Sequence, residues 1–412
     1  MPDSARPRHA TRRPSLALPS LLTVALLAIA LLAIALLAGA CRTPREHAAF
    51  AAPAIRVATF NASLSRDGAT QLVNELAAGS AHASAVAAIV QRVRPDILVL
   101  QEFDFDPADV ALDLFRSRYL AKPQHGGTPI EYPHRWSAPT NTGESSDFDL
   151  DGDGRRGGPG DAFGFGHHPG QYGFAILSRH PIETASIRSF RHLPWSAMPG
   201  HAIPPDFFST EAQAALRLSS KNHVDVPVHL PDGRTLHLLV SHPTPPVFDG
   251  DEDRNGRRNH DELRFWSEFL TATDAPWLVD DAGVAGGLPP GAMFVLCGDL
   301  NCDPNDGDSF GSPVRALLAH PRIDASFIPR SVGGIEAARI DGGKNALHLS
   351  SPDADTADFD DTKGPGNLRS DYVLPGRTLR TVDGGVFWPA PDQPDAELVR
   401  VSDHRLVWLD LR

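Results

Sequence analysis

The sequence has little cysteine and no excess of positive charge. Only three cysteines occur in 412 residues, and two of them, Cys297 and Cys302, lie beyond the N-terminal segment. Two cysteines are too few for a disulfide-stabilised scaffold, so we expect both to be buried as small apolar side chains. The formal net charge of −13 argues against a surface that coats itself with nucleic acid. It does not exclude a nuclease, because a bound divalent cation reverses the local field.

The sequence also lacks a repeat of fixed period and the regular alternation of a β/α barrel. Short apolar runs bounded by turn residues recur instead, with helical patterns between some of them. This pattern indicates an α/β chain. We predict strands at 55–60, 96–100, 174–177, 236–240, 293–297, 372–374 and 406–411, and helices around 86–93 and 263–270. Two stretches with little periodicity, 120–170 and 185–235, are interpreted as loop insertions beside the functional site.

The N-terminal segment has the features of an export signal and is excluded from the fold. Four arginines precede an almost unbroken apolar run from Leu21 to Ala38, and small residues precede Cys41. Residues 1–41 are similar to a bacterial lipoprotein signal, in which Cys41 becomes the lipidated first residue. A signal anchor stays open, because the run is just long enough to span a bilayer.

We expect residues 42–54 to be a tether and residues 55–412 to form a single domain. The mature protein is then an exported cell-envelope lipoprotein, periplasmic or extracellular. We expect a monomer that meets the membrane only through its N-terminal lipid.

Polar residues that can bind metal or phosphate stand at the ends of most predicted strands. Neighbouring strands bring their ends to a common edge, so such side chains can converge there. For any one of them, a capped or solvated strand end is the simpler explanation, but that does not explain the whole set. The set is Asn61, Glu102, His242, Asp299, Asn301, Asp371, Asp403 and His404.

These segments, in this order, resemble the endonuclease/exonuclease/phosphatase superfamily, whose fold is deoxyribonuclease-I-like. The matching segments are Val57 to Asn61, Pro95 to Glu102, Tyr172 to Arg179, Ser241-His242, Gly298 to Asn301, Arg369 to Tyr372 and Ser402 to His404. The resemblance covers residues 55–412. It implies a four-layer α/β sandwich with two packed mixed β-sheets and outer helices. The long insertions and the Pro243-Thr244-Pro245-Pro246 run depart from the family pattern, which leaves the substrate open.

Phosphoester hydrolysis requires that negative charge be neutralised and that water be activated. A hard cation, Mg²⁺ or Mn²⁺, neutralises the charge and prefers oxygen ligands. Glu102 is the ligand candidate by residue type, and the resemblance adds Asp403 and Asn61. His404 is the candidate acid, base or phosphate-polarising group, because an imidazole titrates near neutral pH.

The resemblance also assigns roles to the remaining residues at the strand ends. It implies that Asp371 orients His404, that Asp299 positions or activates water, and that Asn301, Asn61 and His242 donate hydrogen bonds to phosphate. The division of acid and base roles between Asp299 and His404 stays open. Judged by its position alone, His242 fits a structural role as well as it fits a phosphate contact.

An aspartate-rich segment has the spacing of an EF-hand loop. Asp251, Asp253, Asn255 and, after Gly256 and five more residues, Glu262 could bind Ca²⁺. Prolines ahead of the segment forbid an entering helix, so an ordinary polar loop that caps the next helix is the alternative. Arg257 or Arg258 could clamp a substrate phosphate. A second run of alternating aspartates, Asp147 to Asp153, lacks the closing glutamate.

The sequence therefore predicts an exported, metal-dependent phosphodiesterase that hydrolyses nucleic acid or another phosphodiester. A phosphomonoesterase or a lipid phosphodiesterase on the same fold stays open. A non-catalytic, calcium-stabilised surface binding protein is the alternative from another class. The sequence keeps every acid and the final histidine of the motifs, which favours an enzyme.

Overall fold

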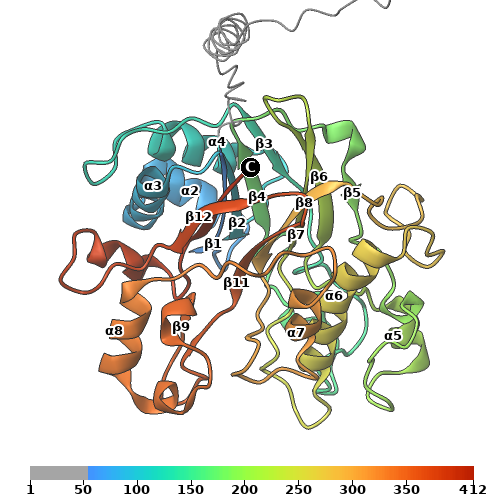
Figure 1. The fold of residues 1–412 in the computed structure, drawn as a ribbon. Coiled ribbons are helices and arrows are strands. Elements are labelled where there is room, and N and C mark those ends of the chain that lie inside the picture. The colour runs from blue at the N-terminus through green and yellow to red at the C-terminus, as the bar shows by residue number, and fades with distance from the viewer. Residues whose placement is uncertain (1–53) are drawn as a thin grey trace, which may run out of the picture. The chain divides into compact units, whose positions relative to one another are not determined.

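Two mixed β-sheets pack face to face in residues 54–412, the part of the chain that the computed structural model describes (Figure 1). The predicted signal, lipidation site and tether (residue 54 apart) lie outside these residues. The first sheet has the strand order β12-β13-β1-β2-β4-β3. Its strands are β1 (Ile55–Leu64), β2 (Ile97–Phe103), β3 (His134–Ser137), β4 (Phe174–Ser178), β12 (Thr381–Val386) and β13 (Val407–Leu411).

The second sheet has the strand order β11-β8-β7-β6-β5. Its strands are β5 (Arg188–Ser189), β6 (His223–His229), β7 (Thr235–Ser241), β8 (Met293–Asp299) and β11 (Asp371–Pro375). The pairs β1–β2 and β7–β8 are parallel, and the other neighbours are antiparallel. A small ribbon of β9 (Ala357–Asp358) and β10 (Asn367–Leu368) lies apart from both sheets.

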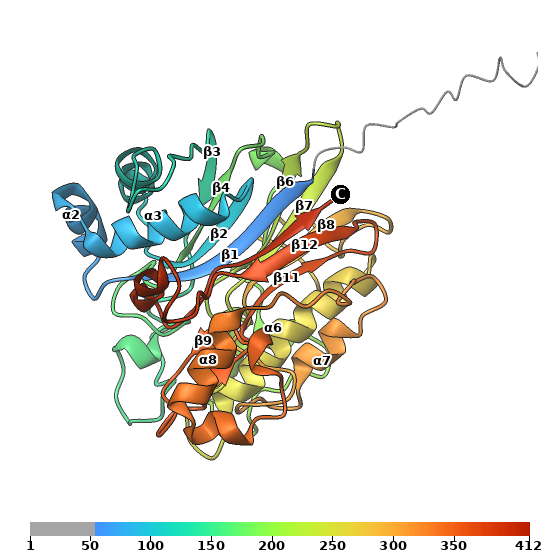
Figure 2. The ribbon, with the colours of Figure 1, turned by 60° about the vertical axis from the view of Figure 1, so that its left-hand side comes forward.

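Helices cover the outer face of each sheet (Figure 2). The first sheet is covered by α2 (Gln71–Ala78), α3 (Ala81–Val93) and α4 (Val110–Leu114). The second is covered by α6 (Arg254–Thr271) and α7 (Pro313–Leu318), while α5 (Thr210–Ala215) and α8 (Val332–Asp341) belong to the connecting segments. The prediction of a four-layer α/β sandwich is confirmed.

Alternation along the strands explains why apolar layers form on both faces of each sheet. In β2, Val99 packs between the sheets, whereas Leu98 and Leu100 face the helices on the outer side. In β8, Val295 packs between the sheets and Leu296 faces α6 and its neighbours. These two central strands are therefore almost wholly apolar, and their polar residues lie toward their ends.

Two helices follow directly from their sequence patterns. At the start of α3, Ser80 accepts a hydrogen bond from the Ala83 N–H at 3.0 Å, and the helix ends at Arg94 (φ 56°) ahead of Pro95. In α6, the spacing of Leu263, Trp266, Phe269 and Leu270 places four buried side chains on one face. Burial of each contributes about 1.5–3 kcal/mol.

The insertion predicted at 185–235 is shorter than expected. Its last part forms β6, an interior strand between β7 and β5. The strand β12 was also not predicted. Both Cys297 and Cys302 are buried and unbridged. Among residues 54–412, no helix combines the length and the apolar character needed to cross a membrane.

Candidate active site

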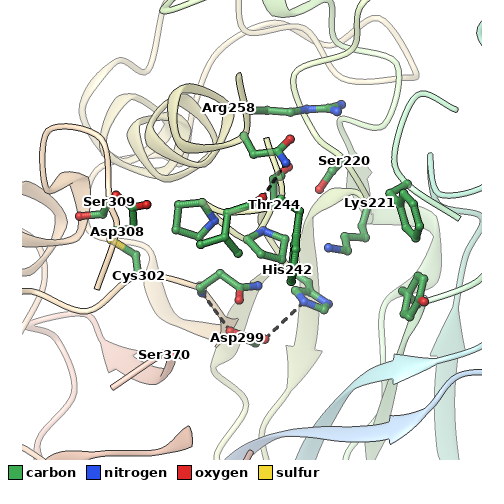
Figure 3. Close-up of a pocket in the computed structure, with 18 of the residues that line it drawn as sticks. Ser220, Lys221, His242, Thr244, Arg258, Asp299, Cys302, Asp308, Ser309 and Ser370 are labelled. Atoms are coloured by element: carbon green, nitrogen blue, oxygen red, sulfur yellow. Dashed lines mark hydrogen bonds and ion pairs between the residues drawn. The ribbon is translucent and has the colours of Figure 1, made fainter. Parts of the chain in front are cut away.

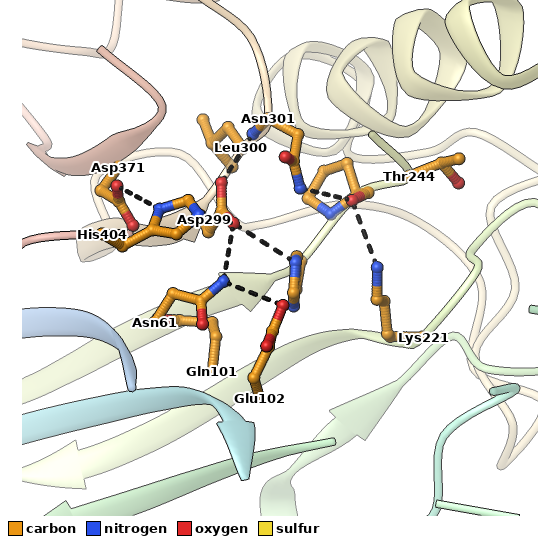
Figure 4. A network of polar contacts seen from close by, with 12 residues as sticks. Asn61, Gln101, Glu102, Lys221, Thr244, Asp299, Leu300, Asn301, Asp371 and His404 are labelled. Atoms are coloured by element: carbon orange, nitrogen blue, oxygen red, sulfur yellow. Dashed lines mark hydrogen bonds and ion pairs between the residues drawn. The ribbon is translucent and has the colours of Figure 1, made fainter. Parts of the chain in front are cut away.

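Residues from both sheets meet at one edge of the sandwich (Figure 4). Asn61 and Glu102 lie near the ends of parallel strands β1 and β2, and Asp299 ends β8. Asp371 begins β11 directly opposite Asp299 in the antiparallel register. His404 precedes β13, the antiparallel neighbour of β1. Strand direction and register therefore bring these distant segments together.

Asp299 lies at the centre of the site and is almost fully buried. Its Oδ2 accepts a hydrogen bond from Asn61 Nδ2 at 3.1 Å, and His242 Nε2 and His404 Nε2 lie 3.4 and 3.5 Å away. Its Oδ1 accepts a bond from the Asn301 backbone N–H at 2.9 Å. Burial alone raises the pKa of this carboxyl, but His404, His242 and Asn61 outweigh it and lower the pKa. Asp299 is therefore held as a carboxylate.

His404 is held between two carboxylates. Its Nδ1 lies 2.9 Å from Asp371 Oδ2, and the Thr356 hydroxyl donates to the same oxygen at 2.9 Å. Burial alone lowers the pKa of an imidazole, but Asp371 and Asp299 outweigh it and raise the pKa of His404. The ring is therefore oriented by Asp371 and held as a cation.

The remaining polar residues at the edge lie in contact with this group. Asn61 Nδ2 also donates to Glu102 Oε1 at 3.2 Å, which links β1 to the end of β2. Asn301 Nδ2 donates to the Pro243 carbonyl at 3.1 Å. Burial lowers the pKa of His242, and its buried Nδ1 has no hydrogen-bond partner within residues 54–412.

Two of these residues have left-handed backbone conformations. Glu102 has φ 53° and Asn301 has φ 50°, backbone angles that residues other than glycine rarely adopt. Such strain costs about 1 kcal/mol or more per residue and is concentrated at functional sites. Here it turns a carboxylate and an amide toward the shared edge.

The edge opens into a cavity of about 1040 Å³ (Figure 3). Glu102, His242, Asp299, Asn301 and His404 line it. Its walls include residues of the connecting segments 120–170 and 185–235 and of the segment that follows β7. The two exposed phenylalanines Phe165 and Phe248 also line it.

Oxygen donors for a hard cation are present in the cavity. Glu102 is partly exposed there, and Asn61 is in contact with it. The exposed Asp403 also lines the cavity. Carboxylate and amide oxygens suit Mg²⁺ or Mn²⁺. Asp299, Asp371 and His404 also come within metal-ligand spacing of one another, but both ring nitrogens of His404 already face carboxylates.

Sequence reasoning missed several residues of the site. Lys221 and Thr244 line the cavity and are buried. Thr356 donates to Asp371, and the Ser402 hydroxyl donates to the Asn61 carbonyl at 2.8 Å. Ser402 belongs to a matching motif and Thr244 lies two residues after His242, so a role for both could have been found, whereas Lys221 and Thr356 lie in segments without a recognisable pattern.

The predicted EF-hand loop does not form, and this prediction is wrong. Asp253 (φ 52°) directly precedes α6 without a side-chain cap bond, and both Asn255 and Glu262 lie inside the helix. Glu262 is fully buried and Asp251 is exposed. The Glu262 carboxylate accepts hydrogen bonds from the Ser220 and Thr244 N–H groups at 2.7 and 2.6 Å. The spacing matched because a helix start also favours acidic and amide residues.

The two predicted phosphate-binding arginines lie in different surroundings. Arg257 does not line the cavity and lies over the Phe310 ring. Arg258 lines it, but its guanidinium donates to the carbonyls of Leu218, Phe163 and Arg217. The assignment of Arg257 is therefore corrected, whereas a phosphate contact by Arg258 stays a prediction.

In the second acidic run, three carboxylates lie within 4.8 Å of one another, those of Asp149, Asp151 and Asp153. All three accept backbone N–H bonds from residues within the same loop.

Comparisons with known proteins identify a family that the chain matches. A sequence profile described as the Endonuclease/Exonuclease/phosphatase family matches residues 58–404. An endonuclease/exonuclease/phosphatase from Beutenbergia cavernae is 18% identical, with 87% of this chain and 72% of that chain covered and a TM-score of 0.49. The human Nocturnin catalytic domain with bound sulfate is 15% identical, with 87% and 93% covered and a TM-score of 0.42.

An AP endonuclease from Archaeoglobus fulgidus is 13% identical, with 86% of this chain and 98% of that chain covered and a TM-score of 0.40. No curated protein sequence matched the chain.

Proposed function

Because the chain belongs to the endonuclease/exonuclease/phosphatase family, we propose that it is a divalent-metal-dependent phosphodiesterase. One observation carries the proposal. Asp299 Oδ2 is shared by Asn61, His242 and His404 within 3.5 Å, at the wall of a cavity that Glu102 also lines. This arrangement combines a carboxylate, an imidazolium and amide donors around a space large enough for a phosphoester.

Glu102, Asn61 and Asp403 are the residues that would hold Mg²⁺ or Mn²⁺. A bound divalent cation neutralises charge on the phosphate oxygens. The donor chemistry fits, since Glu102 and Asp403 line the cavity with carboxylate oxygens, and Asn61, which contacts Glu102, carries an amide oxygen. The concentration of acidic groups there also favours a cation, because Glu102, Asp299 and Asp403 line one cavity.

Asp299 and His404 divide the proton transfers in this proposal. Asp299 accepts a proton from the attacking water, which is consistent with the donors that hold it ionised. His404 carries a proton on Nδ1 toward Asp371 and another on Nε2 toward Asp299, at the wall of the cavity. Its Nε2–H polarises a phosphate oxygen and supplies a proton to the leaving oxygen. The products are an alcohol and a phosphomonoester, and no covalent intermediate is required.

Asn301 and His242 lie where they can stabilise the charge that develops on phosphate. Both flank Asp299 and line the cavity. Preorganised donors of this kind each contribute about 10²- to 10³-fold to the rate. Nucleic acid or another phosphodiester is the proposed substrate class, and a phosphomonoester or a lipid phosphodiester is the alternative.

Hydrolysis of chromogenic esters tests the proposal directly. The purified protein is assayed with bis(p-nitrophenyl) phosphate and p-nitrophenyl phosphate in Mg²⁺, Mn²⁺ and excess EDTA. We expect metal-dependent release of p-nitrophenol, faster from the diester, that EDTA abolishes. His404→Ala should lower kcat by about 10²- to 10⁴-fold, whereas the matched control His229→Ala, at an exposed site, should leave it unchanged.

The binding-protein alternative predicts a different result. Wild-type protein would then hydrolyse neither ester in any metal, and His404→Ala would change nothing. A residual rate equal in wild type and His404→Ala would point to a contaminant and would count against the enzyme.

We also propose that the protein is exported and lipidated at Cys41. The support is the order of arginines, apolar run and small residues ahead of Cys41. Cells expressing the full chain are labelled with a palmitate analogue. Label should appear in wild type and be lost in Cys41→Ser, and equal labelling would contradict lipidation there.

A further inference from the structure

Lys221 is a buried lysine on the wall of the catalytic cavity. It lies two residues before the start of β6 and is 6% exposed. Within residues 54–412 its ammonium group makes a single hydrogen bond, a long one of 3.5 Å to the Pro243 carbonyl. An ammonium group has three N–H donors, so two of them lack an acceptor.

The charges around Lys221 do not form an ion pair with it. Glu262, Glu102 and Asp299 favour its charged form, and Arg258 opposes it. No carboxylate in the described part of the chain lies within ion-pair distance of its nitrogen. A cation buried with so few partners is costly unless a ligand completes its contacts.

Thr244, beside Lys221, has a second buried polar group whose hydrogen bonds are not all made. Its hydroxyl is buried at the cavity wall and has no hydrogen-bond partner among residues 54–412. Its backbone is fixed, because the Thr244 N–H donates to Glu262 at 2.6 Å and its carbonyl accepts from Asn259 at 2.8 Å. The side chain is therefore held in place with its oxygen free.

Lys221 is also placed beside a residue of the proposed active site. Asn301 Nδ2 donates to the same Pro243 carbonyl at 3.1 Å, so the amide and the ammonium group converge on one oxygen (Figure 4). Figure 3 shows Lys221, Thr244 and His242 around the same space. A phosphate that contacts Asn301 and His242 would therefore be within reach of Lys221.

We propose that Lys221 and Thr244 form an oxyanion subsite that donates hydrogen bonds to non-bridging oxygens of the phosphoryl group. The identification of the anion as phosphate rests on the proposed function. The subsite binds either the substrate's phosphate or free orthophosphate. Charge-assisted donors from lysine and a hydroxyl are typical of phosphate sites.

Orthophosphate binding by the full-length protein tests the subsite without catalysis. Calorimetric titrations in EDTA, and separately in Mg²⁺, compare wild type with Lys221→Met, Lys221→Arg and Thr244→Val. Lys221→Met should weaken binding about 10- to 100-fold and Thr244→Val about 3- to 10-fold, while Lys221→Arg recovers part of the loss. The control Lys122→Met removes an exposed lysine and should bind as wild type does.

A second measurement uses only the wild-type protein, in case Lys221→Met does not fold. Reductive methylation is followed by mass spectrometry with and without saturating orthophosphate. Phosphate should slow methylation of Lys221 and leave Lys122 unaffected. Unchanged methylation of Lys221, or wild-type phosphate affinity in folded Lys221→Met, would overturn the proposal.

The two proposals fail in different ways. If the protein hydrolyses no phosphoester but Lys221→Met still loses phosphate affinity, the subsite stands and the proposed function fails. If hydrolysis is normal and phosphate affinity is unchanged in Lys221→Met, the function stands and the subsite fails. For ester substrates, the subsite also predicts a higher KM and a lower kcat in Lys221→Met.

Discussion

Glutamine in place of Glu262 should destabilise the protein by about 2–4 kcal/mol. The carboxylate is fully buried in α6. Its Oε1 accepts bonds from the Ser220 N–H (2.7 Å) and hydroxyl (3.0 Å), and its Oε2 accepts one from the Thr244 N–H (2.6 Å). Glutamine has a single carbonyl oxygen, so its NH₂ group must face a backbone N–H on one side.

Two effects make up this magnitude. A backbone N–H left without an acceptor in the interior costs about 1–3 kcal/mol. The bonds that remain lose their charge-assisted part, which is about 1 kcal/mol in total. The sum is about 2–4 kcal/mol, a large share of the stability of a typical domain.

Urea unfolding followed by tryptophan fluorescence, at pH 7 in EDTA, measures the change. The matched control is Glu268→Gln on the same helix, where the side chain is partly exposed and the expected change is within about 0.5 kcal/mol. A calcium loop predicts the opposite pattern. A loss below 0.5 kcal/mol in EDTA, together with a calcium-dependent rise in Tm that Glu262→Gln and Asp251→Asn both abolish, would refute our reasoning.

Acidification should destabilise the protein through His223, because burial lowers the pKa of this ring from 6.5 to about 4. The ring takes up a proton below pH 6.5 in the unfolded chain but only near pH 4 in the folded protein. The free energy of unfolding should therefore fall by about 2 kcal/mol between pH 7 and pH 5. Urea unfolding of His223→Gln should show a flatter pH dependence, and an equal slope would exclude His223 as the cause. Asn in place of Asp371 should lower kcat about 100-fold or more, because His404 loses the carboxylate that orients it. Wild-type kcat in folded Asp371→Asn would contradict that role. Phe165 is 57% exposed and Phe248 86% exposed, and both line the cavity. Alanine at either should raise the KM for thymidine 5′-(p-nitrophenyl) phosphate about 5- to 100-fold. The KM for methyl p-nitrophenyl phosphate should change little, and equal changes for the two esters would argue against ring stacking.

The layers of the fold could be predicted because several central strands are short, local apolar runs. Such runs identify strands wherever both faces are buried, as at Val295 and Leu296 in β8. The family motifs at the strand ends then fix which ends belong together. Parallel pairing of β1 with β2, and of β7 with β8, follows from tertiary structure and was not predicted.

β6 was missed although it carries a signal. Val224, Val226 and Val228 alternate with polar residues and face the first sheet, which is the period of a strand. Pro227 in the middle lowers the expectation of an interior strand. Asp225 stands between two of the valines, and its Oδ1 lies 2.8 Å from His237 Nδ1 on β7. Cross-strand pairing of this kind is not visible in one segment.

Residues with non-local partners could not be assigned from the sequence. Lys221 looks like a solvated residue in a polar loop, and only the packing of α6 and the segment after β7 buries it. Glu262 fits a calcium pattern by spacing, yet its partners lie at residues 220 and 244. The sequence shows the residue types and their spacing, but the surroundings of a side chain decide its role.

The direction of β1 has a practical consequence. The strand begins at Ile55 and reaches Asn61 six residues later, a separation of about 20 Å at about 3.3 Å per residue. Any carrier joined ahead of Ile55 is therefore attached at the end of the strand remote from the catalytic groups. Coupling the protein to a bead or a fusion partner through that end should leave access for bulky phosphoesters and preserve turnover.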